Sequence, residues 1–187
     1  MVLPDTIQTN ERELRRWDHA FVNEMVDAVV FSLPALEPWM PWALTSLGAN
    51  DRRMASAKGR NDFDEGKAWK YGLFWRDSGQ LVESAGLHRE DDRACPEIGY
   101  WVRTDRTRRG YATQSASALT AAAFKCLPDV QRVQICVDPA NLASASVPRT
   151  LGYRLARKEA QPIEATSHTG TVEVWILQRF DPSAGVD

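Results

Sequence analysis

The stretch EIGYWVRTDRTRRGYATQSASALTAAAF, residues 97–124, decides the fold of this chain. Its first part, EIGYWVR, is rich in aromatic and β-branched residues and predicts a strand over residues 97–103. Its last part has apolar residues three or four positions apart, as on one face of a helix: Ala112, Ala116, Leu119 and Ala123. We therefore expect a long helix that begins at Gly110, after a basic loop, and ends before Pro128.

The junction between this strand and this helix is a candidate anion site. The first N–H groups of a helix have no partner within it, and the helix dipole favours a negative charge there. Gly110 lets the backbone approach a pyrophosphate closely. Local positive charge comes from four arginines, Arg103, Arg106, Arg108 and Arg109. A solvated basic loop is the alternative, and neither a GKS/GKT phosphate loop nor a dinucleotide GxGxxG motif is present.

The segments on both sides extend this pattern into a mixed α/β domain. Before the stretch we expect a strand over 6–17, a helix capped by Asp18 and ending near Ser32, Pro-rich helical turns to Leu44, a solvated helix within 46–67, and strands over 68–76 and 80–88. After it we expect a strand over 130–137, a short helix over 142–151 closed by Gly152, and strands over 153–159 and 172–180. The sequence predicts a single domain over 1–187, with a core at about 7–180, about seven mostly antiparallel strands and frayed termini.

The composition is that of an ordinary soluble domain. The 187 residues are 43% hydrophobic and 26% charged, with a net charge of −2, which argues against non-specific nucleic-acid binding. No apolar run is long enough to cross a membrane. The three cysteines lack a CxxC spacing and do not cluster with the three histidines, so we expect free thiols and no metal site. The N-terminus has no apolar signal region, so we expect a cytoplasmic protein.

Three segments resemble one known family. The stretch 97–124 is similar to the central motif of the GNAT acetyltransferase superfamily, particularly its RimJ/RimL-type branch. NLASASVPRTLGY, residues 141–153, resembles the family's Asn-x-x-Ser helix closed by Gly-Phe or Gly-Tyr, and LEPWMPWA, residues 36–43, resembles a segment near the start of this branch. The resemblance covers about residues 7–180. It implies the GNAT fold, a mostly antiparallel sheet flanked by helices and splayed where acetyl-CoA binds.

The resemblance also implies acetyl-CoA as acyl donor, without a metal. Gly110 and Ala112 match the family's Arg/Gln-x-x-Gly-x-Gly/Ala loop, although Thr107 stands at its first position. Contacts to the pyrophosphate then fall on Thr107, Arg108, Arg109, Gly110, Ala112 and Thr113. Contacts to the acetyl and pantetheine part fall on the strand end, Trp101, Val102 and Arg103. Asn141 matches a cofactor-binding Asn, with a turn or helix-cap role as the alternative.

Two residues are the catalytic candidates. Ser144 matches the Ser near the cofactor sulfur, where it would donate a proton or a hydrogen bond to the thiolate. Many GNAT enzymes have a Tyr four residues before the terminal Gly of this helix, where this chain has Pro148. Glu97, 13 residues before Gly110, is the candidate general base, with a solvent-facing Glu as the alternative.

The acceptor side carries weaker signals. Glu83 stands where the branch usually has Gly, and we expect it to face either solvent or the acceptor cleft. Glu164 is a weaker candidate base. Trp39 and Trp42 are candidate cleft walls, whereas Trp69 and Trp75 are expected in the core.

The sequence thus predicts an N-acyltransferase that moves an acetyl group to a primary amine by direct attack in a ternary complex. The acceptor would be a protein N-terminus or a small amine, with neither nucleic acid nor membrane as partner, and the protein a monomer or homodimer. The alternatives are a non-catalytic or regulatory CoA-binding module, a GNAT that uses another acyl-CoA such as succinyl-CoA, and a nucleotide-phosphate-binding enzyme.

Overall fold

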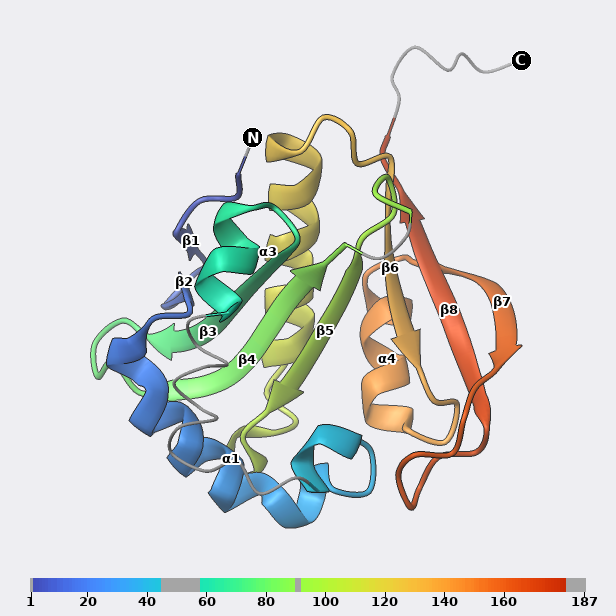
Figure 1. Cartoon of the computed structure of the whole chain (residues 1–187), viewed down its shortest axis with the longest axis horizontal. Helices are drawn as coiled ribbons and strands as arrows, with labels where there is room; N and C mark the ends of the chain where they lie inside the picture. The colour runs from blue at the N-terminus through green and yellow to red at the C-terminus, as the bar shows by residue number, and fades with distance from the viewer. Residues whose placement is uncertain (1, 45–57, 90–91, 181–187) are drawn as a thin grey trace.

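A computed structural model describes residues 2–44, 58–89 and 92–180, in which one sheet of eight strands carries helices on both faces (Figure 1). In chain order the elements are β1 (Thr6–Gln8), β2 (Arg12–Arg16), η1 (His19–Phe21), α1 (Val22–Leu36), η2 (Pro41–Leu44), β3 (Ala68–Trp75), β4 (Leu81–His88), β5 (Glu97–Val102), η3 (Thr104–Arg106), α3 (Tyr111–Cys126), β6 (Arg132–Val137), α4 (Leu142–Thr150), β7 (Arg154–Ala160) and β8 (Thr171–Gln178). A helical segment also covers residues 58–64. No helix in these ranges is long and apolar enough to span a membrane.

The predicted α/β order is confirmed, and the N-terminal boundaries are corrected. The single strand expected over 6–17 is a hairpin of β1 and β2, because Thr9 N–H bonds to the Arg12 carbonyl and turns the chain. The sheet therefore has eight strands instead of about seven. Most of the helix expected within 46–67 falls on residues 45–57, which lie outside the described ranges.

The first helix is also longer than predicted. Asp18 caps η1, accepting from Ala20 N–H, and α1 then continues through Pro34 to Leu36 instead of ending near Ser32. Proline removes the hydrogen bond that the Val30 carbonyl would otherwise receive. Val30 is 61% exposed, so water can supply that bond and the helix tolerates Pro34.

Successive side chains of β5 point to opposite faces of the sheet, and each face has its own hydrophobic core. Ile98 belongs to a large cluster that also contains Leu119 of α3 and Ala145 of α4. Trp101, three residues later and on the opposite face, belongs to a second cluster with residues of α1 and the end of β3. α3 and α4 therefore share one face of the sheet, and α1 covers the other.

The sheet opens between β5 and β6. These two parallel strands, both within the described ranges, pair at one position, Glu97 with Gln134. Every other neighbouring pair of strands is antiparallel and paired over at least three positions. Beyond Glu97 the two strands diverge, with α4 behind the space between them (Figure 1). Beyond Glu97, the edge of β5 that faces β6 thus has no strand partner among the described residues.

Candidate active site

The loop from β5 to α3 ends in an open helix N-terminus. Gly110, at φ +74°, forms the N-cap of α3, and the preceding Arg108 also has a positive φ of 59°. The Gln114 N–H bonds to the Gly110 carbonyl at 2.9 Å, so the N–H groups of the three residues before it lie at the free end of the helix. A Cβ built on Gly110 would meet nothing within 4 Å. The predicted loop residues therefore surround open space in front of the helix dipole.

The arginines of this loop divide into two pairs. Arg103 bonds to Asp105 at 2.9 Å and lies over the Phe31 ring, and Arg106 bonds to Gln80 at 2.9 Å. These two side chains brace the loop against its surroundings. Arg108 and Arg109 are exposed and form no ion pair within the part of the chain that the structure describes. They supply positive charge beside the helix end.

The open edge of β5 presents backbone donors toward β6. Pro96 C=O accepts from Gln134 N–H, and Arg103 N–H bonds to Val82 of β4. Because backbone groups alternate sides along a strand, the N–H groups of Tyr100 and Val102 point toward β6, beyond the last paired position. Of the three strand-end residues expected to contact the acyl donor, Val102 offers its N–H to the open edge, whereas Arg103 uses its N–H within the sheet.

The first turn of α4 meets β5 across this opening. Asn141 caps the helix, its side-chain oxygen accepting from Ser144 N–H at 3.1 Å, so the cap role is observed and its contact to a cofactor stays a prediction. The Tyr100 hydroxyl donates to the Ser144 carbonyl at 3.0 Å and accepts from Ser144 Oγ at 3.3 Å. Sequence reasoning missed Tyr100, although alternation along β5 places it on the face that α3 and α4 cover.

Glu97 lies at the apex of the opening, where β5 and β6 make their one pairing. It is half-buried, and Gln134 Nε2 donates to its carboxylate at 3.2 Å, so it is more than a solvent-facing residue. Alternation turns its side chain to the face opposite Tyr100. On the same face, burial and then Glu97 raise the pKa of the Cys136 thiol. The structure thus places the two polar groups, Glu97 and Tyr100, on opposite faces of β5.

The expectation that Glu83 could face solvent is wrong. Glu83 is fully buried on β4 and accepts a hydrogen bond from Ser115 of α3 at 2.9 Å, while its Oε1 has no partner within the described residues. Burial raises the pKa of Glu83 to about 8, against the opposing effect of the Ser115 bond. The physical reason is its position: β4 is a central strand, and α3 covers this face. A contact to the acceptor stays a prediction.

The expected aromatic wall lies beside the loop between β7 and β8. Trp42 is 39% exposed, and its ring centre lies 6.2 Å from that of Trp101. The Trp39 carbonyl accepts from His168 Nε2 at 3.0 Å, and the Pro38 carbonyl accepts from Ser167 N–H at 2.9 Å. Glu164 is exposed on the same loop. The segment that carries the two tryptophans is therefore joined to the loop that follows β7.

The two tryptophans expected in the core lie there. Trp69 is fully buried in the large cluster that contains Ile98, and Trp75 packs against that cluster.

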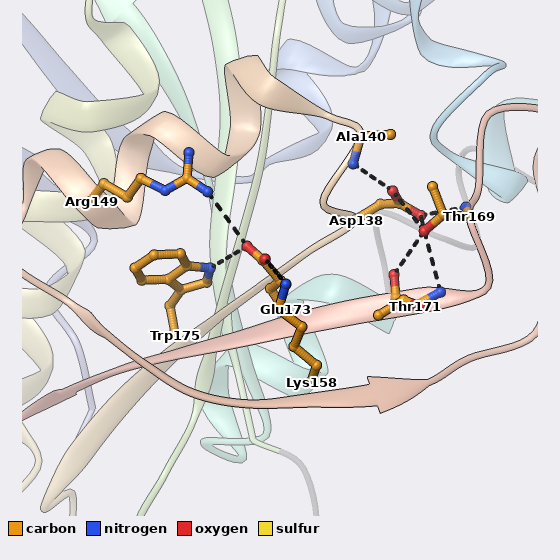
Figure 2. A network of polar contacts seen from close by, with 8 residues as sticks. All are labelled: Asp138, Ala140, Arg149, Lys158, Thr169, Thr171, Glu173 and Trp175. Carbon is orange, nitrogen blue, oxygen red and sulfur yellow. Dashed lines mark hydrogen bonds and ion pairs between the residues drawn. The ribbon is translucent and has the colours of Figure 1, made fainter.

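Two buried carboxylates fix that loop and the strands beside it (Figure 2). Asp138, after β6, accepts from the N–H groups of Thr169 and Ala140; burial alone would raise its pKa, but these hydrogen bonds outweigh burial and hold the pKa low. Glu173 of β8 bonds to Lys158 at 2.9 Å, which lowers its pKa, and lies 3.7 Å from Arg149 of α4. The C-terminal hairpin is thereby tied to the turn between β6 and α4 and to the C-terminal end of α4.

Residues 12–154 match the sequence pattern of the acetyltransferase (GNAT) domain, and the match spans more than half of the chain. The chain belongs to the GNAT acetyltransferase family. The resemblance seen in the sequence is thus confirmed, and this GNAT domain is an enzyme. Among curated protein sequences, comparison found no match.

Solved GNAT structures share the fold over nearly the whole chain. RimL, a ribosomal alpha-N-protein acetyltransferase in complex with coenzyme A, has a TM-score of 0.83 and 19% identity, covering 95% of this chain and 98% of its own. RimJ of Mycobacterium smegmatis in complex with a CoA disulfide has a TM-score of 0.83 and 18% identity, covering 95% and 90%. MccE, a microcin self-immunity acetyltransferase in complex with acetyl-CoA and AMP, has a TM-score of 0.82 and 13% identity, covering 91% and 94%.

Proposed function

We propose that this GNAT domain transfers an acetyl group from acetyl-CoA to a primary amine by direct attack in a ternary complex. The observation that carries the proposal is the open N-terminus of α3 at Gly110 beside the unpaired edge of β5. The helix end suits a pyrophosphate, with Arg108 and Arg109 beside it. The N–H groups of Tyr100 and Val102, which have no strand partner in the part of the chain that the structure describes, suit an extended, amide-containing arm such as pantetheine. The coenzyme A and acetyl-CoA held by similar structures support this assignment.

Direct attack fits the cysteines of the chain. A covalent route needs a thiolate, and a buried thiol with a raised pKa is a poor nucleophile. Burial raises the pKa of both Cys95 and Cys136, and Glu97 raises that of Cys136 further. The third cysteine, Cys126, is the last residue of α3, at the end of the helix opposite Gly110. The attacking group is therefore the amine itself, held beside the thioester. The rate gain comes from orientation and from backbone N–H groups that polarise the thioester carbonyl.

Glu97 is the proposed general base. The acceptor arrives as an ammonium ion and must lose a proton before it attacks. Glu97 lies at the apex of the opening, on the face of β5 that also carries Trp101. Trp42 stands beside Trp101 on that face, and with Trp39 it would line the approach of the acceptor. The amine then attacks from this face, while the sulfur leaves toward α4 on the other.

The test measures CoA release from acetyl-CoA with a panel of short peptides with free N-termini and small primary amines. We expect turnover with at least one class and a fall in kcat of about 100-fold for Glu97→Gln, with acetyl-CoA affinity unchanged. Glu24→Gln, on the exposed side of α1, is the matched control and should keep full activity. Tight acetyl-CoA binding without turnover across the panel would instead favour a non-catalytic CoA-binding module. Faster turnover with succinyl-CoA than with acetyl-CoA would identify succinyl-CoA as the preferred acyl donor.

A further inference from the structure

Pro148 lies inside α4 and alters the bonding of the first turn of that helix. In a regular α-helix the Ser144 carbonyl accepts from the N–H of the residue four positions later, which here is Pro148. Proline has no N–H, so the carbonyl loses its partner within the helix. The Tyr100 hydroxyl donates to this carbonyl instead, at 3.0 Å. Pro148 is thereby coupled, through Ser144, to a side chain on β5.

Tyr100 is held from a second direction as well. Ser144 Oγ donates to the Tyr100 oxygen at 3.3 Å, so the phenol oxygen both gives and receives a hydrogen bond at the start of α4. Burial raises the pKa of Tyr100; Ser144 lowers it in part, and Glu83 and Tyr153 raise it further. The hydroxyl therefore keeps its proton at physiological pH. Its chemistry is that of a hydrogen-bond donor rather than of an acid that ionises.

We infer that Tyr100 is the hydrogen-bond donor to the thioester sulfur in this chain, and that Pro148 is the residue that positions it. The inference rests on the proposed function, because it needs a thioester between β5 and α4. Rotation about the phenol C–O bond turns the hydrogen from the Ser144 carbonyl toward the sulfur without moving the ring. Ser144 Oγ still supports the phenol oxygen after that rotation.

The acetyl transfer is balanced in atoms and electrons when Tyr100 donates a hydrogen bond to the sulfur. The amine nitrogen forms a C–N bond to the acetyl carbon, the C–S bond breaks, and sulfur takes the bonding electron pair. The Tyr100 hydrogen bond stabilises the negative charge that develops on sulfur. Nitrogen loses two protons in all. The proton that Glu97 takes from the ammonium ion before attack passes to solvent, and the proton that nitrogen loses once the C–N bond has formed reaches the thiolate through water, which leaves an amide and a thiol.

The first experiment measures the thiol pKa of CoA bound to the protein, from thiolate absorbance against a blank with CoA that lacks the sulfur. A hydrogen bond to a charged group corresponds to about one to two pKa units, so Tyr100→Phe should raise the thiol pKa by about that amount. In the same variant kcat should fall about 10- to 100-fold, while acetyl-CoA affinity changes less than about threefold. Tyr71→Phe is the matched control, because that phenol also donates to a backbone carbonyl, that of Pro4, but from β3. It should change neither quantity.

The second experiment tests the part played by Pro148. Pro148→Ala restores an N–H for the Ser144 carbonyl and releases Tyr100 from it. We expect a lower kcat for Pro148→Ala than for the wild-type protein. We also expect Tyr100→Phe to lower the melting temperature less when it is added to Pro148→Ala than when it is made in the wild-type protein. If the double variant instead loses the sum of the two single-variant losses in melting temperature, Pro148 does not position Tyr100. If Tyr100→Phe does not fold, the kcat of Pro148→Ala alone tests the inference, because that variant keeps the phenol. A lower kcat would support the positioning role of Pro148, and an unchanged kcat would contradict it.

The outcomes separate this inference from the proposed function. Wild-type turnover with an unchanged thiol pKa and kcat in Tyr100→Phe would overturn the role of Tyr100 and leave the acetyltransferase proposal intact. A wild-type protein that binds neither CoA nor acetyl-CoA would overturn both.

Discussion

Glu83 is a fully buried carboxyl group on a central strand. Among the described residues only Ser115 donates a hydrogen bond to it, and burial raises its pKa to about 8 from an ordinary value of 4.5. Between these two values the folded protein holds a proton that the unfolded chain has released. Folding stability therefore falls as the pH rises from about 4.5 to about 8, and the loss is complete above that range.

Replacing this carboxyl group should remove that dependence on pH. Glu83→Gln keeps an acceptor for Ser115 but cannot ionise, so its advantage in unfolding free energy over the wild-type protein should grow between pH 5 and pH 9, by on the order of a few kcal/mol. Denaturant titrations at the two pH values measure this difference. Glu24→Gln, on the exposed side of α1, should show no such growth. An equal difference at both pH values would mean that Glu83 is ionised in the folded protein.

Single residues also show where sequence reasoning succeeds. Gly110 could be assigned from its place between a strand and a helix, because local sequence determines a helix start, and its positive φ bears this out. The burial of Glu83 and the bond from Tyr100 to Ser144 could not, because each depends on an element far away in the chain: α3 above Glu83, and α4 beside Tyr100. A contact between elements far apart in the chain cannot be predicted from the sequence pattern of either element alone.

At the scale of elements, the N-terminus of α3 should depend on Gly110 for a reason beyond backbone strain. Gly110→Val forces a β-branched side chain to a φ of +74° and places it in the open space before the helix. Gly79, in the turn before β4, has a φ of +68° and equally open space, so Gly79→Val carries similar strain away from the site. Each variant should lose about 1–3 kcal/mol of stability, but Gly110→Val alone should lose acetyl-CoA binding.

Calorimetric titration of both glycine variants with acetyl-CoA provides this comparison. Retained affinity in Gly110→Val would remove the helix end from the phosphate site. Equal losses of affinity in the two variants would point to a general effect of destabilisation.

The errors in the predicted elements have local physical causes. The strand expected over 6–17 gave no strong turn signal, because Thr9 and its neighbours close the hairpin with backbone and hydroxyl bonds and without Gly or Pro. The sequence predicts that the first helix ends near Ser32, but Pro34 lies on an exposed face, which lets the helix continue to Leu36. The strands around the opening, by contrast, alternate clearly and were predicted to within two residues.

At the scale of the whole molecule, the opening between β5 and β6 unites the elements that act on the two substrates. α3 and α4 lie on one face of the sheet and supply the helix end and Ser144, whereas the other face carries Glu97 and Trp101. Asp138 and the loop between β7 and β8 join the tryptophan segment to the end of β6. The order of the elements allowed this fold class to be predicted, because a helical crossover between β5 and β6 makes that pair parallel.

The most direct test of the central claim is a thermal-shift titration of the wild-type protein with acetyl-CoA, CoA and ATP. A ligand at about 100 times its Kd adds roughly 2.7 kcal/mol of stability, which corresponds to about 5–11 °C for a domain of this size. We predict a shift of that order with acetyl-CoA and CoA and none with ATP. Equal shifts with ATP, or no shift with either CoA compound, would contradict the assignment of an acyl-CoA site to the opening between β5 and β6.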